Sequence, residues 1–91
     1  MNIGDILSGM SNVDIEGNIV DMNNFMLLMR DKTGQIFVRY WRKFVPREET
    51  RALCSKLKIG NNVKIANCDA FNWQGILQLK LARQGQVNLI S

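Results

Sequence analysis

The stretch that decides the fold is Met29-Arg30-Asp31-Lys32-Thr33-Gly34-Gln35-Ile36-Phe37-Val38-Arg39-Tyr40-Trp41. After the turn formers at 31–34, apolar Ile36, Val38 and Tyr40 alternate with Phe37, Arg39 and Trp41, so the two sets lie on opposite faces of a strand. The first set suits a protein core. The second places an arginine between two aromatic rings, and such a combination stacks on flat bases and neutralises phosphates. We therefore predict a strand with one core face and one binding face.

Length and charge narrow the class of protein. The chain has 91 residues, of which 46% are hydrophobic, and this predicts one folded domain over residues 1–91 with a single core. Twelve Lys and Arg against eight Asp and Glu give a net charge of +4. A basic balance of this size favours an anionic partner without proving one.

The chemistry of catalysis and of metal binding finds no support in the sequence. The chain has no histidine, and Cys54 and Cys68 are too few and too far apart for a zinc site. It also has no nucleophile motif and no glycine loop that would cradle a phosphate. We expect no enzyme, no cofactor and no metal. Both cysteines are expected to be small core residues.

Targeting signals are not evident either. The opening residues 1–10 contain Asp5 and two glycines and lack a continuous apolar stretch, and no segment approaches membrane-spanning length. We expect an intracellular protein with reduced thiols, in the cytoplasm of a prokaryote or the nucleus of a eukaryote, without a membrane partner.

The rest of the chain supplies four more strands and a helix. Strands are expected over residues 13–20, 25–30, 63–70 and 75–81, and Gly17 is expected to mark a bulge or bend in the first. A helix is expected from Pro46 to Leu57, because proline suits a first helical position and Glu48 and Glu49 follow in the first turn. In the last strand, Leu77, Leu79 and Leu81 should point inward, and Ile76, Gln78 and Lys80 outward.

This element order predicts the fold class. Three strands, a helix and two strands form the order of an OB-fold, an all-β, five-stranded Greek-key barrel with one helix between strands 3 and 4.

Three motifs carry a family resemblance. They are Asp31-Lys32-Thr33-Gly34 with Trp41 seven residues after the glycine, Lys58-Ile59-Gly60-Asn61-Asn62-Val63-Lys64-Ile65, and Trp73-Gln74-Gly75-Ile76-Leu77-Gln78-Leu79. In this order and spacing the chain resembles the simple archaeal single-stranded DNA-binding proteins, their eukaryotic relatives in DNA-damage sensing, and single OB domains of replication protein A. The resemblance implies sequence-tolerant binding of single-stranded DNA, in replication, recombination or repair.

The resemblance also implies which residues bind. Trp41 and Trp73 fall on two stacking aromatics of that family. Asp69 falls on the third, where a carboxylate cannot stack; either Phe71 takes over that role or the site has lost a platform. Trp41 or Trp73 could instead cover the core, a reading that their outward or loop placement opposes. The expected nucleic-acid-binding residues are Trp41, Trp73, Phe37 and Phe71 for stacking, and Arg39, Arg42, Lys43, Lys32, Lys64 and Lys80 for phosphates.

The sequence is also compatible with two other functions. The fragment from Leu28 to Ile36 also resembles the RNA-binding OB domain of class II aminoacyl-tRNA synthetases, although the later tryptophan-glycine motif fits that family less well. Some OB domains instead act as protein adaptors in DNA-processing complexes, and Asp69 with an exposed Ile76 would suit a protein partner. A continuous basic and aromatic groove favours DNA, whereas an apolar patch rimmed by charge favours a protein.

Overall fold

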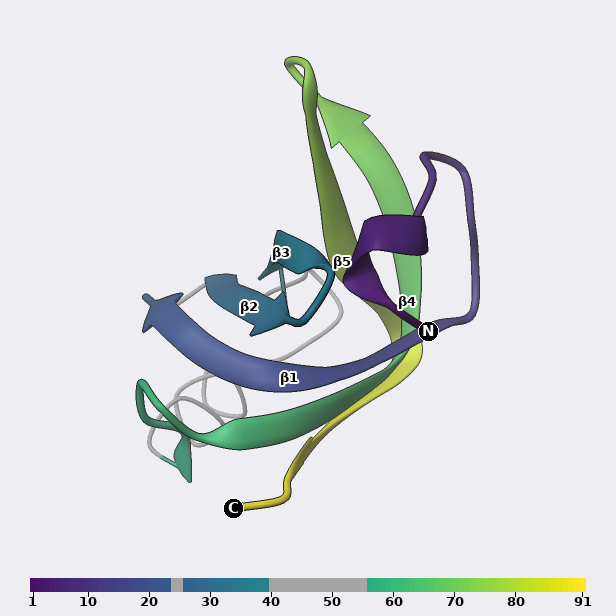
Figure 1. The fold of residues 1–91 in the computed structure, drawn as a ribbon. Helices are drawn as coiled ribbons and strands as arrows, with labels where there is room; N and C mark the ends of the chain where they lie inside the picture. The colour runs from purple at the N-terminus through teal and green to yellow at the C-terminus, as the bar shows by residue number, and fades with distance from the viewer. Residues whose placement is uncertain (24–25, 40–55) are drawn as a thin grey trace.

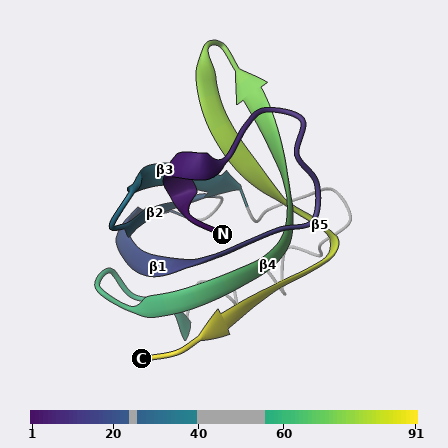
Figure 2. The same ribbon diagram turned by 45° about the vertical axis from the view of Figure 1, so that its right-hand side comes forward.

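Five strands close into a barrel. The computed structural model describes residues 1–23, 26–39 and 56–91. After the short 3-10 helix η1 (Ile3–Asp5) come β1 (Val13–Met22), β2 (Met26–Asp31), β3 (Gly34–Arg39), β4 (Asn62–Trp73) and β5 (Ile76–Leu89). The barrel order is β1-β2-β3-β5-β4, with β1–β3 as an antiparallel meander and β3 parallel to β5 (Figures 1 and 2). The predicted all-β class and five-stranded barrel are confirmed.

Gly17 lies where β1 changes partners. Residues 13–18 of β1 pair with β4, and residues 18–22 pair with β2. A Cβ atom at Gly17 would collide with the carbonyl oxygen of Arg30, so the close approach of β1 and β2 requires glycine here. The register of β1 is continuous at Gly17 and shifts instead between Val13 and Ile15 and between Ile19 and Asp21, so the expected bulge is not at this glycine, where β1 changes partners.

A bulge at Asn67 divides β4 into two halves. The register with β5 shifts between Ala66 and Cys68, and Asn67 adopts a positive φ of 62°. The carboxylate of Asp14 accepts a hydrogen bond from the Asn67 backbone N–H at 2.8 Å, which satisfies this donor. The bulge lets both halves of β4 keep apolar side chains in the core while their outward residues face different surroundings.

The barrel interior is filled by alternating strand residues. Ile36 and Val38 are 4% and 0% exposed, and Leu79 and Leu81 are 0% and 6% exposed, as their alternation predicts. Cys68 is also buried, as expected, while Cys54 lies outside the described residues. Fully buried side chains come from every strand: Val13, Ile15, Ile19, Leu27, Met29, Val38, Val63, Ile65, Cys68 and Leu79.

Two strands are longer than the sequence indicated. β5 continues past Leu81 to Leu89, and β4 continues to Trp73, so the predicted loop at 72–75 contracts to the two-residue turn Gln74–Gly75. Both turn residues have positive φ, 51° and 83°, which is the geometry of a tight hairpin that matches strand twist. The resulting β4–β5 hairpin projects from the barrel in Figure 1.

The predicted helix falls almost entirely outside the described residues. Of the range from Pro46 to Leu57, only the last two residues are described, and Leu57 is buried in the core at 6% exposure. Leu7, in the N-terminal segment, is 65% exposed. Ile3 and Ile6 of the same segment are the residues that enter the core.

The β2–β3 turn is held by one carboxylate. Asp31 accepts hydrogen bonds from the backbone N–H groups of Thr33 and Gly34 and from the Thr33 hydroxyl. It also accepts one from the Ile3 N–H at 2.8 Å, which fastens η1 to the turn. Desolvation raises the pKa of this carboxyl, but the hydrogen bonds outweigh it and lower the pKa below its ordinary value. The Asp31 carboxylate therefore links the N-terminal segment to the barrel by hydrogen bonds.

Candidate nucleic-acid interface

Strands β3, β5 and β4 place two rows of outward residues side by side. In the first row, Gln78 of β5 lies in register with Phe37 on one side and Phe71 on the other. In the second row, Lys80 lies between Arg39 and Asp69. The Trp73–Ile76 pair continues the surface onto the hairpin. We call this surface the aromatic face; it consists of Phe37, Arg39, Asp69, Phe71, Trp73, Ile76, Gln78 and Lys80.

Cationic groups lie over the rings of this face. The guanidinium carbon of Arg39 is 5.6 Å from the centroid of the Trp73 ring, and the Lys80 ammonium is 5.6 Å from the centroid of the Phe71 ring. Both distances are within the range of cation–π attraction. The rings and the charges are therefore interleaved on one surface, which is what the alternation in β3 predicted for Phe37 and Arg39.

Gln78 departs from its expected exposure. It points to the outward side, as predicted, yet it is only 5% exposed, because it lies between two aromatic side chains. Its side-chain oxygen accepts a hydrogen bond from Arg39 Nε at 2.9 Å. Gln78 is not among the residues expected to bind, and no signal in the local sequence distinguishes it from an ordinary outward glutamine.

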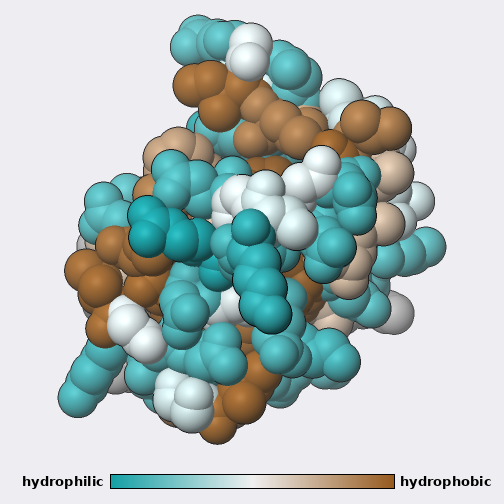
Figure 3. Space-filling model, in the orientation of Figure 1, coloured by the Kyte–Doolittle hydropathy of each residue, from teal (hydrophilic) through white to brown (hydrophobic). Residues whose placement is uncertain are grey.

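The hairpin end of the face is open to solvent. Trp73 is 50% exposed and Ile76 is 51% exposed, so Trp73 is not a core residue. Figure 3 shows hydrophobic surface along this projecting hairpin. Trp73 was expected in a loop, but it is the last residue of β4, where strand pairing with Ile76 fixes its position.

A shallow cavity of about 160 Å³ adjoins the face at Phe37. It extends the surface across β2 towards the end of β1. Its lining combines one carboxylate and one amide with apolar side chains: Asp21, Met22, Asn23, Met26, Leu28 and Phe37.

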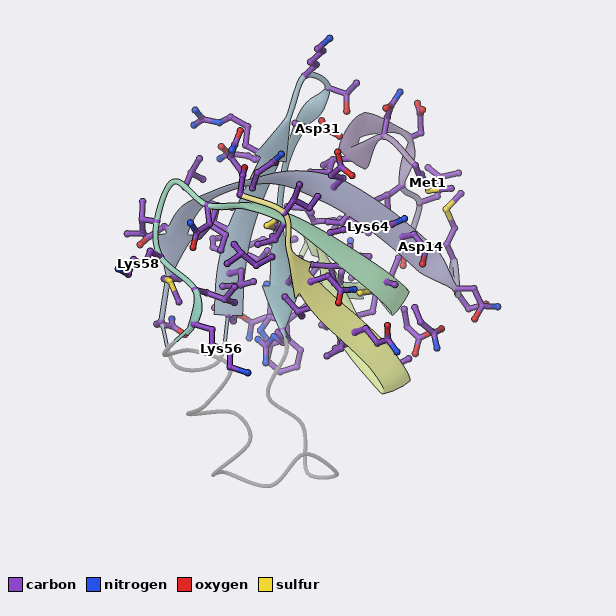
Figure 4. All side chains as sticks on the ribbon, turned by 90° about the horizontal axis from the view of Figure 1, so that it is seen from below. Met1, Asp14, Asp31, Lys56, Lys58 and Lys64 are labelled. Carbon is purple, nitrogen blue, oxygen red and sulfur yellow. The ribbon has the colours of Figure 1, made fainter. Side chains whose placement is uncertain are left out.

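Two predicted phosphate contacts lie away from the aromatic face. Lys64, labelled in Figure 4, precedes the β4 bulge and is flanked in register by Glu16 of β1 and Asn88 of β5. It lies seven positions before Phe71 along β4, which is at most about 23 Å in a fully extended strand. Lys32 is at the exposed tip of the β2–β3 turn. Trp41, Arg42 and Lys43 lie outside the described residues.

Metal and thiol chemistry have no visible basis in the described part of the chain. No group of three or more His, Cys, Asp or Glu side chains within residues 1–23, 26–39 and 56–91 could hold a metal ion. Burial raises the pKa of the Cys68 thiol to about 12, and Asp14 and Asp69 add to the effect by charge repulsion. Cys68 therefore stays protonated at neutral pH and serves the core.

Over the same described ranges, no helix is both long and apolar enough to cross a membrane.

Comparison with solved structures identifies the architecture. No protein family model and no curated protein sequence matches the chain. The structure is similar to the replication factor A related protein from Methanobacterium thermoautotrophicum, with a TM-score of 0.78 and 14% sequence identity over 99% of this chain and 89% of that one. The OB domain of a Thermoplasma acidophilum protein gives a TM-score of 0.73 at 16% identity, over 99% and 85% of the two chains. This chain has the OB-fold.

A second kind of neighbour shares the barrel. The tetrameric p202 HIN2 structure gives a TM-score of 0.74 at 17% identity over the whole of this chain, which spans only 49% of that one. At these identities the likeness is one of fold, and the site must be argued from the residues of this chain.

Proposed function

We propose that this OB-fold domain binds single-stranded DNA with little sequence preference on its aromatic face. The observation that carries the proposal is the pairing of rings with cations on three adjacent strands, with Arg39 over Trp73 and Lys80 over Phe71. Bases stack on aromatic rings whatever their sequence, because every base has a π-face. The phosphates that link the bases need cations beside those rings.

Each part of the face has a role in this proposal. Phe37, Phe71 and Trp73 are the stacking platforms, and Arg39 and Lys80 neutralise the backbone. Trp41, Arg42 and Lys43 follow β3 in the sequence and remain predicted contributors. One OB-fold of this kind covers roughly 4 to 16 nucleotides. The proposed role in replication, recombination or repair rests on the sequence motifs that resemble single-stranded DNA-binding proteins, and the OB-fold shared with a replication factor A related protein is consistent with it.

The test is a fluorescence titration with oligo-dT and oligo-U of equal length. Trp73 lies half-exposed on the face, so its emission should be quenched when bases stack on it. We expect saturable quenching with oligo-dT and weaker quenching with oligo-U. Tighter binding of oligo-U would assign the domain to RNA, whose 2′-hydroxyl groups can add contacts. Absence of quenching with both ligands, together with no binding by anisotropy, would overturn the proposal.

A further inference from the structure

Gln78 is an unusual residue for an outward position. It is the buried polar side chain among the residues the structure describes, at 5% exposure, and it sits between Phe37 and Phe71. A buried amide costs free energy unless it forms hydrogen bonds. A leucine or methionine would fill the same space without that cost, so packing alone does not explain a glutamine at this position.

The hydrogen bond of Gln78 fixes the orientation of both partners. Arginine has only donors, so the group that faces Arg39 Nε at 2.9 Å must be the glutamine carbonyl oxygen, and the amide nitrogen must face elsewhere. No buried side-chain nitrogen or oxygen of the described residues lacks a partner.

Arg39 is therefore held at two points. Its Nε donates to Gln78, and its guanidinium carbon lies over the Trp73 ring, 5.6 Å from the centroid. A free arginine side chain loses rotamer entropy when it is fixed, and a side chain already held does not lose it again on binding. With Nε occupied, the two terminal Nη groups are the donors left for a ligand, and they form a fork that suits a phosphate.

We infer that Gln78 is a positioning residue of the nucleic-acid interface, which holds Arg39 across Trp73 so that its terminal guanidinium nitrogens meet a backbone phosphate. This inference rests on the proposed function for the identity of the ligand. It assigns Gln78 a role that neither its residue type nor its place in the sequence suggests.

The test compares Gln78→Met with Gln78→Glu. Methionine keeps the length and volume of glutamine but cannot accept the Arg39 hydrogen bond, whereas glutamate keeps an acceptor at the same place. The first readout is the Arg39 Nε–H signal in a ¹⁵N-correlated NMR spectrum of the free protein. We expect this signal to exchange slowly with water in the wild type and in Gln78→Glu, and quickly in Gln78→Met.

The second readout is binding of oligo-dT. We expect Gln78→Met to weaken binding about tenfold, the scale of one hydrogen bond to a charged group, and to flatten the log–log salt slope by roughly 0.7, the share of one phosphate on a single strand. In an Arg39→Gln background, Gln78→Met should have little further effect, because the two residues act as one unit. Gln78→Glu adds a negative charge, so its affinity is compared with that of Gln35→Glu, an exposed glutamine on β3.

The outcomes separate this inference from the proposed function. Failure of the wild type to bind any oligonucleotide would overturn the function, while the NMR signal would still report whether Gln78 holds Arg39. If the wild type binds and Gln78→Met lowers the melting temperature alone, with an unchanged salt slope, Gln78 is a packing residue and the inference is wrong. Additive losses in the double variant would overturn it in the same way.

Discussion

The two halves of β4 both expose side chains to solvent, yet they present different chemistry. Before the bulge, Lys64 lies in register with Glu16, so a basic and an acidic residue are neighbours and no aromatic residue flanks them. After the bulge, Phe71 and Trp73 lie beneath the cations of Lys80 and Arg39. The net charge of the chain therefore does not locate the interface. The second half differs because the cations of Lys80 and Arg39, on β5 and β3, lie over its aromatic rings.

The largest effect on binding should come from removing a ring. Trp73→Ala is expected to weaken oligo-dT binding by about 1 to 3 kcal/mol, the usual scale for one stacking platform. Because Trp73 is half-exposed at the end of β4, melting followed by circular dichroism should stay close to wild type. Lys64→Ala on the other half of the strand is the matched control. An equal loss in that variant would mean that the two halves bind DNA alike and that the contrast is wrong.

Adding a ring should sharpen the contrast. Asp69 lies on the aromatic face beside Lys80, where it repels phosphate and cannot stack. Asp69→Trp should tighten binding by about 1 kcal/mol or more, because it adds a platform and removes a negative charge. Lys64→Trp introduces the same ring before the bulge and should not tighten binding. Unchanged oligo-dT affinity in a folded Asp69→Trp protein would show that residue 69 does not face the DNA.

Salt dependence separates the cations of the two halves. If about three to five phosphates are neutralised, the log–log slope of affinity against salt should be roughly −2 to −3.5. Arg39→Gln should flatten that slope by roughly 0.7 and leave base preference unchanged, since a phosphate contact carries no sequence information. Lys64→Gln should leave the slope as it is. If the salt slope changes in Lys64→Gln and not in Arg39→Gln, the DNA backbone runs over the half of β4 before the bulge.

The smallest effect on affinity is expected at Asp31, which belongs to neither half. Asp31→Asn should lower stability by on the order of 1 kcal/mol and leave binding unchanged, because it weakens the hydrogen bonds to η1 and to the turn. The pKa of Asp31 is lowered in the folded state. Its stabilisation is therefore complete above the pKa of an unfolded aspartate, about 4, and is lost as pH falls through the folded value.

Acid unfolding curves check this assignment. The wild type should lose stability at low pH more steeply than Asp31→Asn, because only the wild type has this carboxylate to protonate. Parallel curves for the two proteins would show that Asp31 does not couple folding to pH.

The barrel could be predicted from local patterns because alternation reports burial directly. Ile36 and Val38, and Leu79 and Leu81, occupy the core as their period of two requires, and Gly17 lies where β1 and β2 approach too closely for a side chain. The expected last strand ended too early. Val87 and Leu89 do alternate with polar residues, but this segment has fewer charged and aromatic residues than the strand around Phe37, so its pattern is less distinct. Trp73 was placed in a loop because its neighbours are polar, whereas Gln74–Gly75 alone makes the turn.

The site was only partly predictable for a different reason. Phe37 and Arg39 follow from one strand, but the neighbours that surround them come from β4 and β5. The burial of Gln78 and its bond to Arg39 depend on the parallel pairing of β3 with β5, and no short-range signal encodes that register. That Lys64 and Phe71 both point outward although they are seven positions apart likewise depends on the bulge at Asn67, which shifts the alternation of β4 by one residue.

The pairing of strands that are far apart in the sequence has a kinetic consequence. Phe37 meets Gln78, and Val13 meets Cys68, across long stretches of chain, and proteins dominated by such non-local contacts fold in milliseconds to seconds rather than microseconds. The β4–β5 hairpin can form early because its strands are adjacent, but it carries Phe71 and Trp73 without Phe37 and Arg39. During synthesis on the ribosome the aromatic face cannot be complete until β5 has paired with β3, so a chain made only as far as β4 lacks the full surface proposed to bind DNA.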